Sequence, residues 1–394
     1  MTIRLTLQAT VTLSLFAGGV PAGPSIPAPV RQIARRDASF VVPDSVVAQL
    51  SYVSDMAVSP DNRVFVSDAR LATVFELEAS GSLRRTIGRS GGGPGEFYAV
   101  AMLGFRGDSL WALDAGLNRV SLFPLDGAGR PLVIRLRGVV PRAGSGPADY
   151  AFSGMPESML SDGTMLTTQQ EGDRSKPVAS QIHVFRTGRD LAILDTLGVI
   201  SQQHAVIFTE WTDGASFIMQ PFNDMPIFTA APDGSLVVEV ERMASASSAE
   251  TSFRLVGRNG SAMPLFTRDI TYRPRRLRNA DIERALAIFS DPGVKLPGPV
   301  TVDSIRSKLY RPGFFPPVRE VHVGRDGTTW LRVNFADSPA TGVDWLVLSP
   351  RGFPLARVTT PADFRLMEAD RHTLWGVEGD PLDIPVLAKY VVEG

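Results

Sequence analysis

Ser59-Pro60-Asp61-Asn62, followed by the apolar run Val64-Phe65-Val66, is the stretch that indicates the fold, because the chain repeats its pattern. In each copy, a tight turn built on aspartate separates two short runs of β-forming residues. Aspartate side chains cap such turns, and a neighbouring glycine or asparagine accepts the positive φ that hairpins require. The other turns are Arg106–Ser109, Ser161–Gly163, Pro232–Gly234, Arg325–Gly327 and Ala369–Arg371.

The spacing of these turns predicts the architecture. Successive turn aspartates lie 47, 54, 71, 93 and 44 positions apart. A base period of about 45 to 50 residues fits four strands per unit, and the longer gaps indicate insertions. Six such units predict an all-β, six-bladed β-propeller, in which packing around an axis buries both faces of each sheet. The alternative is an array of unrelated hairpins in two sandwiches, which the shared frame of the turns disfavours.

The two ends of the chain are expected to meet in the last blade. That blade has only three predicted strands, at Phe364–Glu368, Thr373–Val377 and Val386–Val392. We expect Ala38–Val42 to supply the missing outer strand, because joining the ends removes an open sheet edge. The propeller then occupies residues 37–394, and the Pro-rich residues 23–36 form a linker.

Composition excludes several classes of protein. The 394 residues are 44% hydrophobic and 21% charged, which argues against a mainly disordered chain. Lys and Arg (40) balance Asp and Glu (41), whereas a nucleic-acid-binding protein usually carries a basic excess. Cysteine is absent, so disulfides, thiolate metal sites and a cysteine nucleophile are excluded.

The N-terminus has the pattern of an export signal. Arg4 gives a weak positive charge, Leu5–Val20 is uncharged, and Val20-Pro21-Ala22 offers a small-residue cleavage site. We therefore expect residues 1–22 to be a signal peptide and the mature protein to be extracytoplasmic, either periplasmic or secreted. An uncleaved or cytoplasmic tail is the alternative. We expect no membrane insertion, no nucleic-acid partner and a monomer.

A family resemblance appears in the first two units. Gly88–Phe97 resembles the glycine-rich junction of NHL-type repeats, and Leu110–Asp114 and Asn118–Phe123 resemble the rest of that repeat. The match is specific over residues 53–135 and fades afterwards. The chain as a whole is similar to exported bacterial six-bladed propellers of the NHL-like group. That resemblance implies the fold, and it implies little about function.

Few motifs indicate catalysis. The Gly88–Gly95 loop lacks the Lys and Ser or Thr of a phosphate-binding loop, so we interpret it as a link between blades. His322 lies in Val318–Val323, the predicted innermost strand of the fifth unit, where it either lines the axis or packs as a hydrogen-bonded core residue. Asp68 and Asp114 follow the second strands of their units, where they cap loops or bind a ligand.

The long insertions all fall in links between blades, at Gly138–Glu157, Gly198–Pro226 and Asp269–Pro317, so they should crown one face of the propeller. The last should contain two helices, after the N-cap residues Asn279 and Thr301. We expect these helices to cover the propeller rim as a lid. Their apolar stripes consist of Ile282, Leu286, Phe289, Ile305 and Leu309.

The leading hypothesis is an exported scaffold that binds a ligand or protein partner on its crowned face. A basic cluster around Arg275 and Arg276 forms either a solvated surface or an anion-binding rim. The alternative is a metal-dependent lyase or lactone hydrolase at the mouth of the central channel, as occurs among NHL-like propellers. No cofactor is predicted, except a divalent metal under that alternative. The candidate ligand-binding residues are Asp68, Asp114, His204, His322, Arg319, Arg275 and Arg276.

Overall fold

The structure of the protein is a computed structural model. It describes residues 29–68, 70–136, 155–170, 181–201, 204–212, 214–339, 341–379 and 384–393. The predicted signal peptide, residues 1–22, and nearly all of the predicted insertion 138–157 lie outside the described residues. No helix in the described ranges combines the length and apolar character needed to cross a bilayer.

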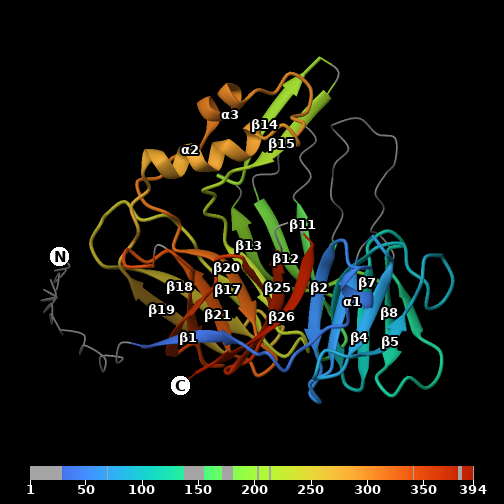
Figure 1. The fold of residues 1–394 in the computed structure, drawn as a ribbon. Coiled ribbons are helices and arrows are strands. Elements are labelled where there is room, and N and C mark those ends of the chain that lie inside the picture. Colours follow the sequence, from blue (N-terminus) through green and yellow to red (C-terminus); the bar gives the residue numbers. More distant parts are fainter. Residues whose placement is uncertain are drawn as a thin grey trace, which may run out of the picture.

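The described residues form six four-stranded units, which are the blades of a propeller (Figure 1). This confirms the fold predicted from the repeated turns. Blade one consists of β2 (Val53–Val58), β3 (Val64–Asp68), β4 (Thr73–Leu77) and β5 (Leu83–Ile87). Blade two consists of β6 (Val100–Arg106), β7 (Ser109–Asp114), β8 (Arg119–Pro124) and β9 (Leu132–Arg135). Blade three consists of β10 (Met155–Met159), β11 (Met165–Gln170), β12 (Gln181–Thr187) and β13 (Ile193–Ser201).

The second half of the ring follows the same order. Blade four consists of β16 (Ile227–Ala230), β17 (Val237–Val240), β18 (Thr251–Arg258) and β19 (Phe266–Tyr272). Blade five consists of β20 (Val318–Val323), β21 (Thr329–Val333), β22 (Val343–Leu348) and β23 (Pro354–Thr360). Blade six consists of β24 (Phe364–Ala369), β25 (Thr373–Gly379), β26 (Pro385–Val392) and the N-terminal β1 (Val30–Arg36). The first strand of each blade lies innermost. Strands β2, β6, β10, β16, β20 and β24 contact one another in sequence, and β24 returns to β2, so the ring is closed.

Tight aspartate turns connect the first two strands of each blade, as predicted. Asp162 and Asp326 each accept a hydrogen bond from the backbone N–H two residues later, at 2.9 and 3.0 Å. Gly234 takes a φ of 67°, and a Cβ there would lie 2.3 Å from the Met159 carbonyl oxygen of the neighbouring blade. Glycine is therefore required at this turn both by its backbone conformation and by the close approach of the adjacent blade.

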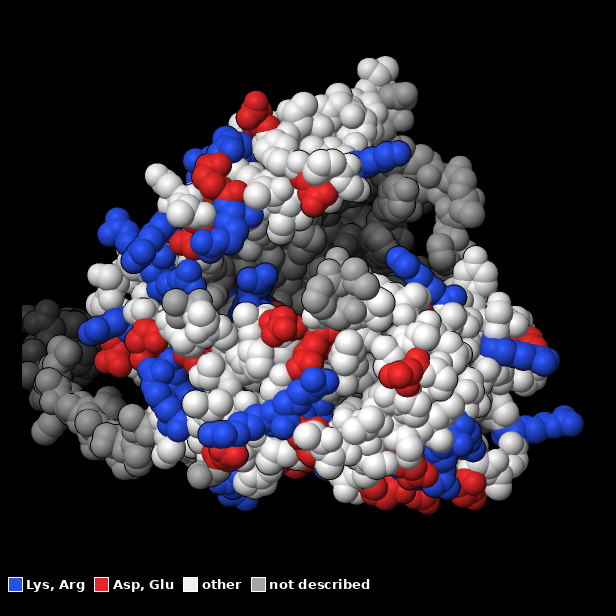
Figure 2. All heavy atoms as spheres, in the orientation of Figure 1, with Lys and Arg blue, Asp and Glu red and all other residues white. Residues whose placement is uncertain are grey.

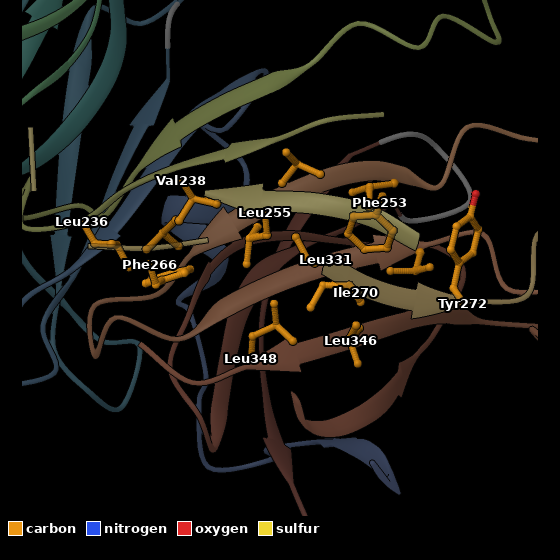
Figure 3. Close-up of a cluster of buried hydrophobic side chains, with 14 of the residues drawn as sticks. Leu236, Val238, Phe253, Leu255, Phe266, Ile270, Tyr272, Leu331, Leu346 and Leu348 are labelled. Carbon is orange, nitrogen blue, oxygen red and sulfur yellow. The ribbon is translucent and has the colours of Figure 1, made fainter. Parts of the chain in front are cut away.

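Apolar clusters between adjacent blades hold the ring together. Figure 3 shows the contact between blades four and five, where Leu255 and Ile270 face Leu331 and Leu346. Equivalent clusters occur at the other five contacts between blades, and a seventh lies within the insertions. The described core is thus distributed around the ring, and each blade depends on both of its neighbours.

The ring-closing strand comes from an earlier segment than the sequence suggested. β1, Val30–Arg36, pairs antiparallel with β26 in the last blade and also parallel with β23 in the fifth. The assignment of the closing strand to Ala38–Val42 was wrong, and most of the described part of the predicted linker is strand. The short helix α1 (Asp44–Val47) follows, and Val46 packs in the cluster between blades six and one.

Two insertions rise together above one face of the ring (Figure 1). One is the hairpin β14 (Val206–Trp211) and β15 (Gly214–Met219), and the other contains α2 (Asn279–Ala287), η2 (Ile288–Ser290) and α3 (Val302–Lys308). We call the two together the lid.

The helices of the lid pack on its hairpin, where Ile207 shares a cluster with Leu286 and Ile305. The expectation that they cover the propeller rim directly was wrong in this respect. Thr301 caps α3 as predicted, by accepting a hydrogen bond from the Ser304 N–H at 3.2 Å. The cap position of α2 is occupied by Arg278, and the predicted cap, Asn279, is the first residue of that helix.

Candidate functional site

A repeated irregularity in the innermost strands positions the side chains around the axis. In five of the described blades, the pairing of the innermost strand with the second strand contains a register shift, at equivalent positions. A β-bulge leaves one residue unpaired and re-aims its side chain. The unpaired residues are Ser54, Ala101, Glu157, Arg319 and Met367. Four of these residues line a cavity on the axis, whereas Arg319 lines a cleft under the lid.

The cleft under the lid, which we call the lid cleft, lies between α2 and strand β20 and has a volume of about 610 Å³. Figure 2 shows the hollow between lid and blades, with basic side chains gathered beside it. Among the described residues that line the cleft, Asp281 is the single acidic residue. The basic residues are Arg242, Arg275, Arg284, Arg319 and Arg332.

Arg242 places a buried positive charge in the floor of the cleft. Its side chain is 7% exposed, and it donates hydrogen bonds to carbonyl oxygens of Met225, Val318 and Asn223. None of these partners is a carboxylate. Burial lowers the pKa of Arg242 to about 10, so the guanidinium is still cationic at neutral pH. The charge therefore contributes a positive potential to the cleft that no described acid neutralises directly.

Arg319 is the most available cation of the cleft. It is exposed, and in the described part of the chain it makes no hydrogen bond or ion pair. Its neighbour Arg332 pairs with Glu320 at 2.6 Å. Desolvation and the charge of Arg332 both lower the pKa of Arg319. An unpaired guanidinium offers up to five N–H donors in a planar arrangement that suits a carboxylate or phosphate.

Apart from its arginines and Asp281, the cleft is lined largely by apolar side chains. Arg275 pairs with Asp281 at 3.2 Å and lies over the ring of Phe315 at 4.9 Å. Two exposed apolar side chains, Met219 at 54% and Ile288 at 64%, line the cleft as well. The lid cleft thus combines cationic donors with an apolar surface, a pairing typical of ligand sites.

The axial cavity is a second, smaller space, with a volume of about 350 Å³. Every innermost strand contributes to its lining. Asp55, Glu368 and His322 lie in three of these strands, and burial raises the pKa of Asp55 to about 6. Burial also lowers the pKa of His322, which hydrogen-bonds the backbone of Met367 and meets Trp345 edge-on at 5.6 Å. His322 therefore lines the axis and is also packed and hydrogen-bonded, so each of the two sequence interpretations describes part of its environment.

The candidate aspartates serve as loop caps. Asp68 is fully buried and accepts hydrogen bonds from the N–H groups of Ser51, Tyr52, Arg70 and Leu71. In the next blade, Asp114 does the same for the N–H groups of Tyr98, Ala99 and Leu117. Neither side chain lines the lid cleft or the axial cavity.

His204 anchors the lid. Its ring stacks on Tyr310 at 3.8 Å, and its Nδ1 lies 3.1 Å from an Asp224 oxygen. The Tyr310 hydroxyl donates to the other Asp224 oxygen at 3.1 Å. Arg276 lines a separate groove on the other side of α2, whereas Arg275 borders both spaces.

The four residues that the sequence suggested for a metal-dependent enzyme are not brought together. Asp68 and Asp114 lie in loops of separate blades, His204 lies in the lid, and His322 lies on the axis. Within the described ranges, no group of three or more His, Cys, Asp or Glu residues is arranged to hold a metal ion.

The glycine-rich loop is a link between blades, as expected. It joins β5 to β6, and Arg119 donates hydrogen bonds to carbonyl oxygens of Gly92, Gly93 and Glu96. Arg119 belongs to the Asn-Arg pair that resembles an NHL repeat. In this blade, therefore, Arg119 fixes the link.

Sequence reasoning missed Arg242, Asp55 and Glu368. An acid inside a predicted innermost strand was a usable signal for Asp55 and Glu368, because such strands converge on the axis. Arg242 follows β17 and gives no comparable signal. Arg242 matters because it has no carboxylate partner among the described residues. That pairing is decided by contacts between blades.

No family model matches this chain, and no curated protein matches it. Similar solved structures include an exported protein from Bacteroides fragilis, with 10% identity over 92% of this chain and 94% of that one, at a TM-score of 0.45. Another is the PQQ-bound aldose sugar dehydrogenase of Streptomyces coelicolor, with 11% identity, coverage of 93% and 100%, and a TM-score of 0.41. A third is virginiamycin B lyase from Staphylococcus aureus, with 11% identity, coverage of 91% and 98%, and a TM-score of 0.40. Identities this low say nothing about the ligand or activity of this chain.

Proposed function

We propose that the protein is an exported binding protein that holds an amphipathic anion in the lid cleft. The observation that carries the proposal is Arg319, an exposed guanidinium without a partner among the described residues, in a cleft that also contains the buried Arg242. Charge-assisted hydrogen bonds from guanidinium to carboxylate or phosphate are among the stronger polar interactions in proteins. An acidic head group is the ligand chemistry that these donors favour.

The apolar lining determines the rest of the ligand. Phe222, Phe289 and Phe315 line the cleft, and Met219 and Ile288 expose apolar surface to it. A small inorganic anion would leave this surface unused, whereas an alkyl or aromatic body would bury it. The proposed ligand is therefore an anion with an apolar body, such as a medium-chain carboxylate.

Titration with decanoate at submicellar concentration tests the proposal. We expect saturable binding by isothermal titration calorimetry, with one decanoate per protein, and weaker or undetectable binding of decanol, which lacks the charge. Arg319→Gln should weaken decanoate binding about 10- to 100-fold, because a hydrogen bond to a charged group contributes roughly 1.5–3 kcal/mol.

Arg351→Gln is the matched control, since Arg351 is exposed, lies outside the cleft and has no hydrogen-bond partner among the described residues. It should leave the affinity for decanoate unchanged. The proposal would be contradicted if decanoate does not bind, or if Arg319→Gln changes the affinity for decanoate no more than Arg351→Gln does.

Export and a monomeric state belong to the same proposal. The charge at Arg4, the uncharged run Leu5–Val20 and the small residues before Gly23 support export. The NHL-like sequence of residues 53–135 supports kinship with the exported propellers of that group. A monomer is the simplest state for a closed ring whose insertions form one lid.

A further inference from the structure

The axial cavity is chemically distinct from the lid cleft. It shares no lining residue with the cleft, and its lining comes from the innermost strands and the residues next to them. Strand β20 connects the two spaces, with Arg319 in the cleft and His322 on the axis. A ligand of the cleft therefore does not account for the groups that line the axis.

The carboxyl groups that line the axial cavity have no basic Lys or Arg side chain beside them in its described lining, which also contains His322. They belong to Asp55, Glu157 and Glu368. The two Asp55 oxygens accept hydrogen bonds from the N–H groups of Leu103 at 2.7 Å and Met56 at 2.9 Å. None of the three acids forms an ion pair with another described residue.

Burial raises the pKa of Glu368 well above its usual range, and the nearby charge of Asp55 raises it further. Glu368 is only 3% exposed. Two buried carboxyl groups that oppose each other's ionisation are stabilised by a cation placed between them. The buried carboxyl groups therefore favour a positively charged occupant.

A second observation, independent of the acids, is the indole of Trp111. This side chain is 3% exposed and lines the cavity, and its Nε1–H has no hydrogen-bond acceptor among the described residues. Buried donors are nearly always paired, with protein or with a bound molecule. Among the described residues, therefore, the indole N–H is left free to donate to a water or to a bound molecule.

Gly104 in the innermost strand β6 explains how a residue of the second strand reaches the axis. A Cβ at Gly104 would lie 2.5 Å from Cζ2 of Trp111 and 2.4 Å from the Pro232 carbonyl oxygen. Because glycine has no side chain, the indole can lie across the innermost strand. Gly104 thus allows Trp111 to line the same cavity as the three acids.

We propose that the axial cavity binds a small hydroxylated amine, whose ammonium group faces Asp55 and Glu368 and whose oxygen accepts from Trp111. The described His, Asp and Glu residues are not arranged to hold a metal ion, which favours an organic cation. A volume of about 350 Å³ accommodates a molecule the size of an amino alcohol or an amino sugar.

Glucosamine, with glucose as its uncharged counterpart, tests the proposal on the full mature protein. We expect one glucosamine per protein by calorimetry, a change in tryptophan fluorescence, and no binding of glucose. Asp55→Asn should weaken glucosamine binding at least tenfold. Trp111→Phe removes the N–H and keeps an aromatic ring, so it should weaken binding several-fold.

Two controls separate this site from the lid cleft and from surface charge. Arg319→Gln should leave glucosamine binding unchanged, and so should Asp363→Asn, which removes an exposed acid. If Asp55→Asn does not fold, Trp111→Phe and Glu157→Gln carry the test. The proposal is overturned if glucosamine and ethanolamine both fail to bind, if glucose binds as tightly, or if the cavity variants that fold bind glucosamine like the wild type.

Discussion

Asp55 shows how a single carboxyl group on the axis affects the stability of the ring. Burial raises its pKa from 3.8 to about 6, so folding favours the protonated form. The stabilisation from this group is complete below pH 4 and is lost as the pH rises through 6. A shift of this size corresponds to about 3 kcal/mol.

Asp55→Asn should therefore alter the pH dependence of stability in a defined way. We expect the free energy of unfolding of the wild type, relative to Asp55→Asn, to fall by about 2–3 kcal/mol between pH 4 and pH 7. Glu368 lines the same cavity, and the charge of Asp55 raises its pKa, so the difference between the two proteins reports Asp55 together with its coupling to Glu368. Urea unfolding at a series of pH values measures the difference, and a difference that stays flat over this range would contradict the buried state of Asp55.

The sequence indicated which residues were candidates for a site better than it indicated what each of them does. Asp68 and Asp114 were candidates for ligand binding, but backbone N–H groups already occupy their oxygens. Arg319, another candidate, lines the lid cleft, yet nothing in its neighbourhood along the chain indicates that it lacks a partner. Pairing is decided by side chains from other blades, and the sequence order does not contain those distances.

Strand β1 is the element on which closure of the ring depends. It pairs with β26 and with β23, so it joins blades six and five into one sheet of eight strands. Ala34 is buried in the cluster between those blades. Removing β1 exposes two sheet edges and opens that cluster to water.

We expect a protein that begins at Asp37 to unfold at a Tm about 5–10 °C lower than one that begins at Pro29, since each kcal/mol shifts the Tm of a large domain by about 2–4 °C. The protein that begins at Pro29 keeps all of β1 and serves as the control. Differential scanning calorimetry of both proteins makes the comparison. Equal melting temperatures would show that β1 does not hold the ring closed.

Elements were predictable where local chemistry defines them. Both helices of the lid were expected near their observed positions, because apolar residues recur with helical spacing and prolines follow. The surface that they cover was not predictable. The hairpin β14–β15 packs on α2 and α3 through residues distant from them in the chain, so this partnership appears only in three dimensions.

The whole molecule consists of a regular ring of six blades and the irregular lid above one face of that ring. The repeated aspartate turns made the six-bladed fold predictable, since each turn specifies a local hairpin and the period specifies the number of strands. The two cavities were not predictable in the same way. The axial cavity lies where the innermost strands of different blades meet, whereas the lid cleft lies between α2 and β20. The bulged residues direct their side chains to one space or the other.

A crystal structure of the mature protein with 10-bromodecanoate tests most directly whether the lid cleft is the ligand site. We predict a carboxylate within hydrogen-bond distance of Arg319 and an anomalous bromine peak beside Met219 and Ile288, the exposed apolar residues of the cleft. Bromine density elsewhere on the protein, with the lid cleft empty at saturating ligand, would contradict the proposed function.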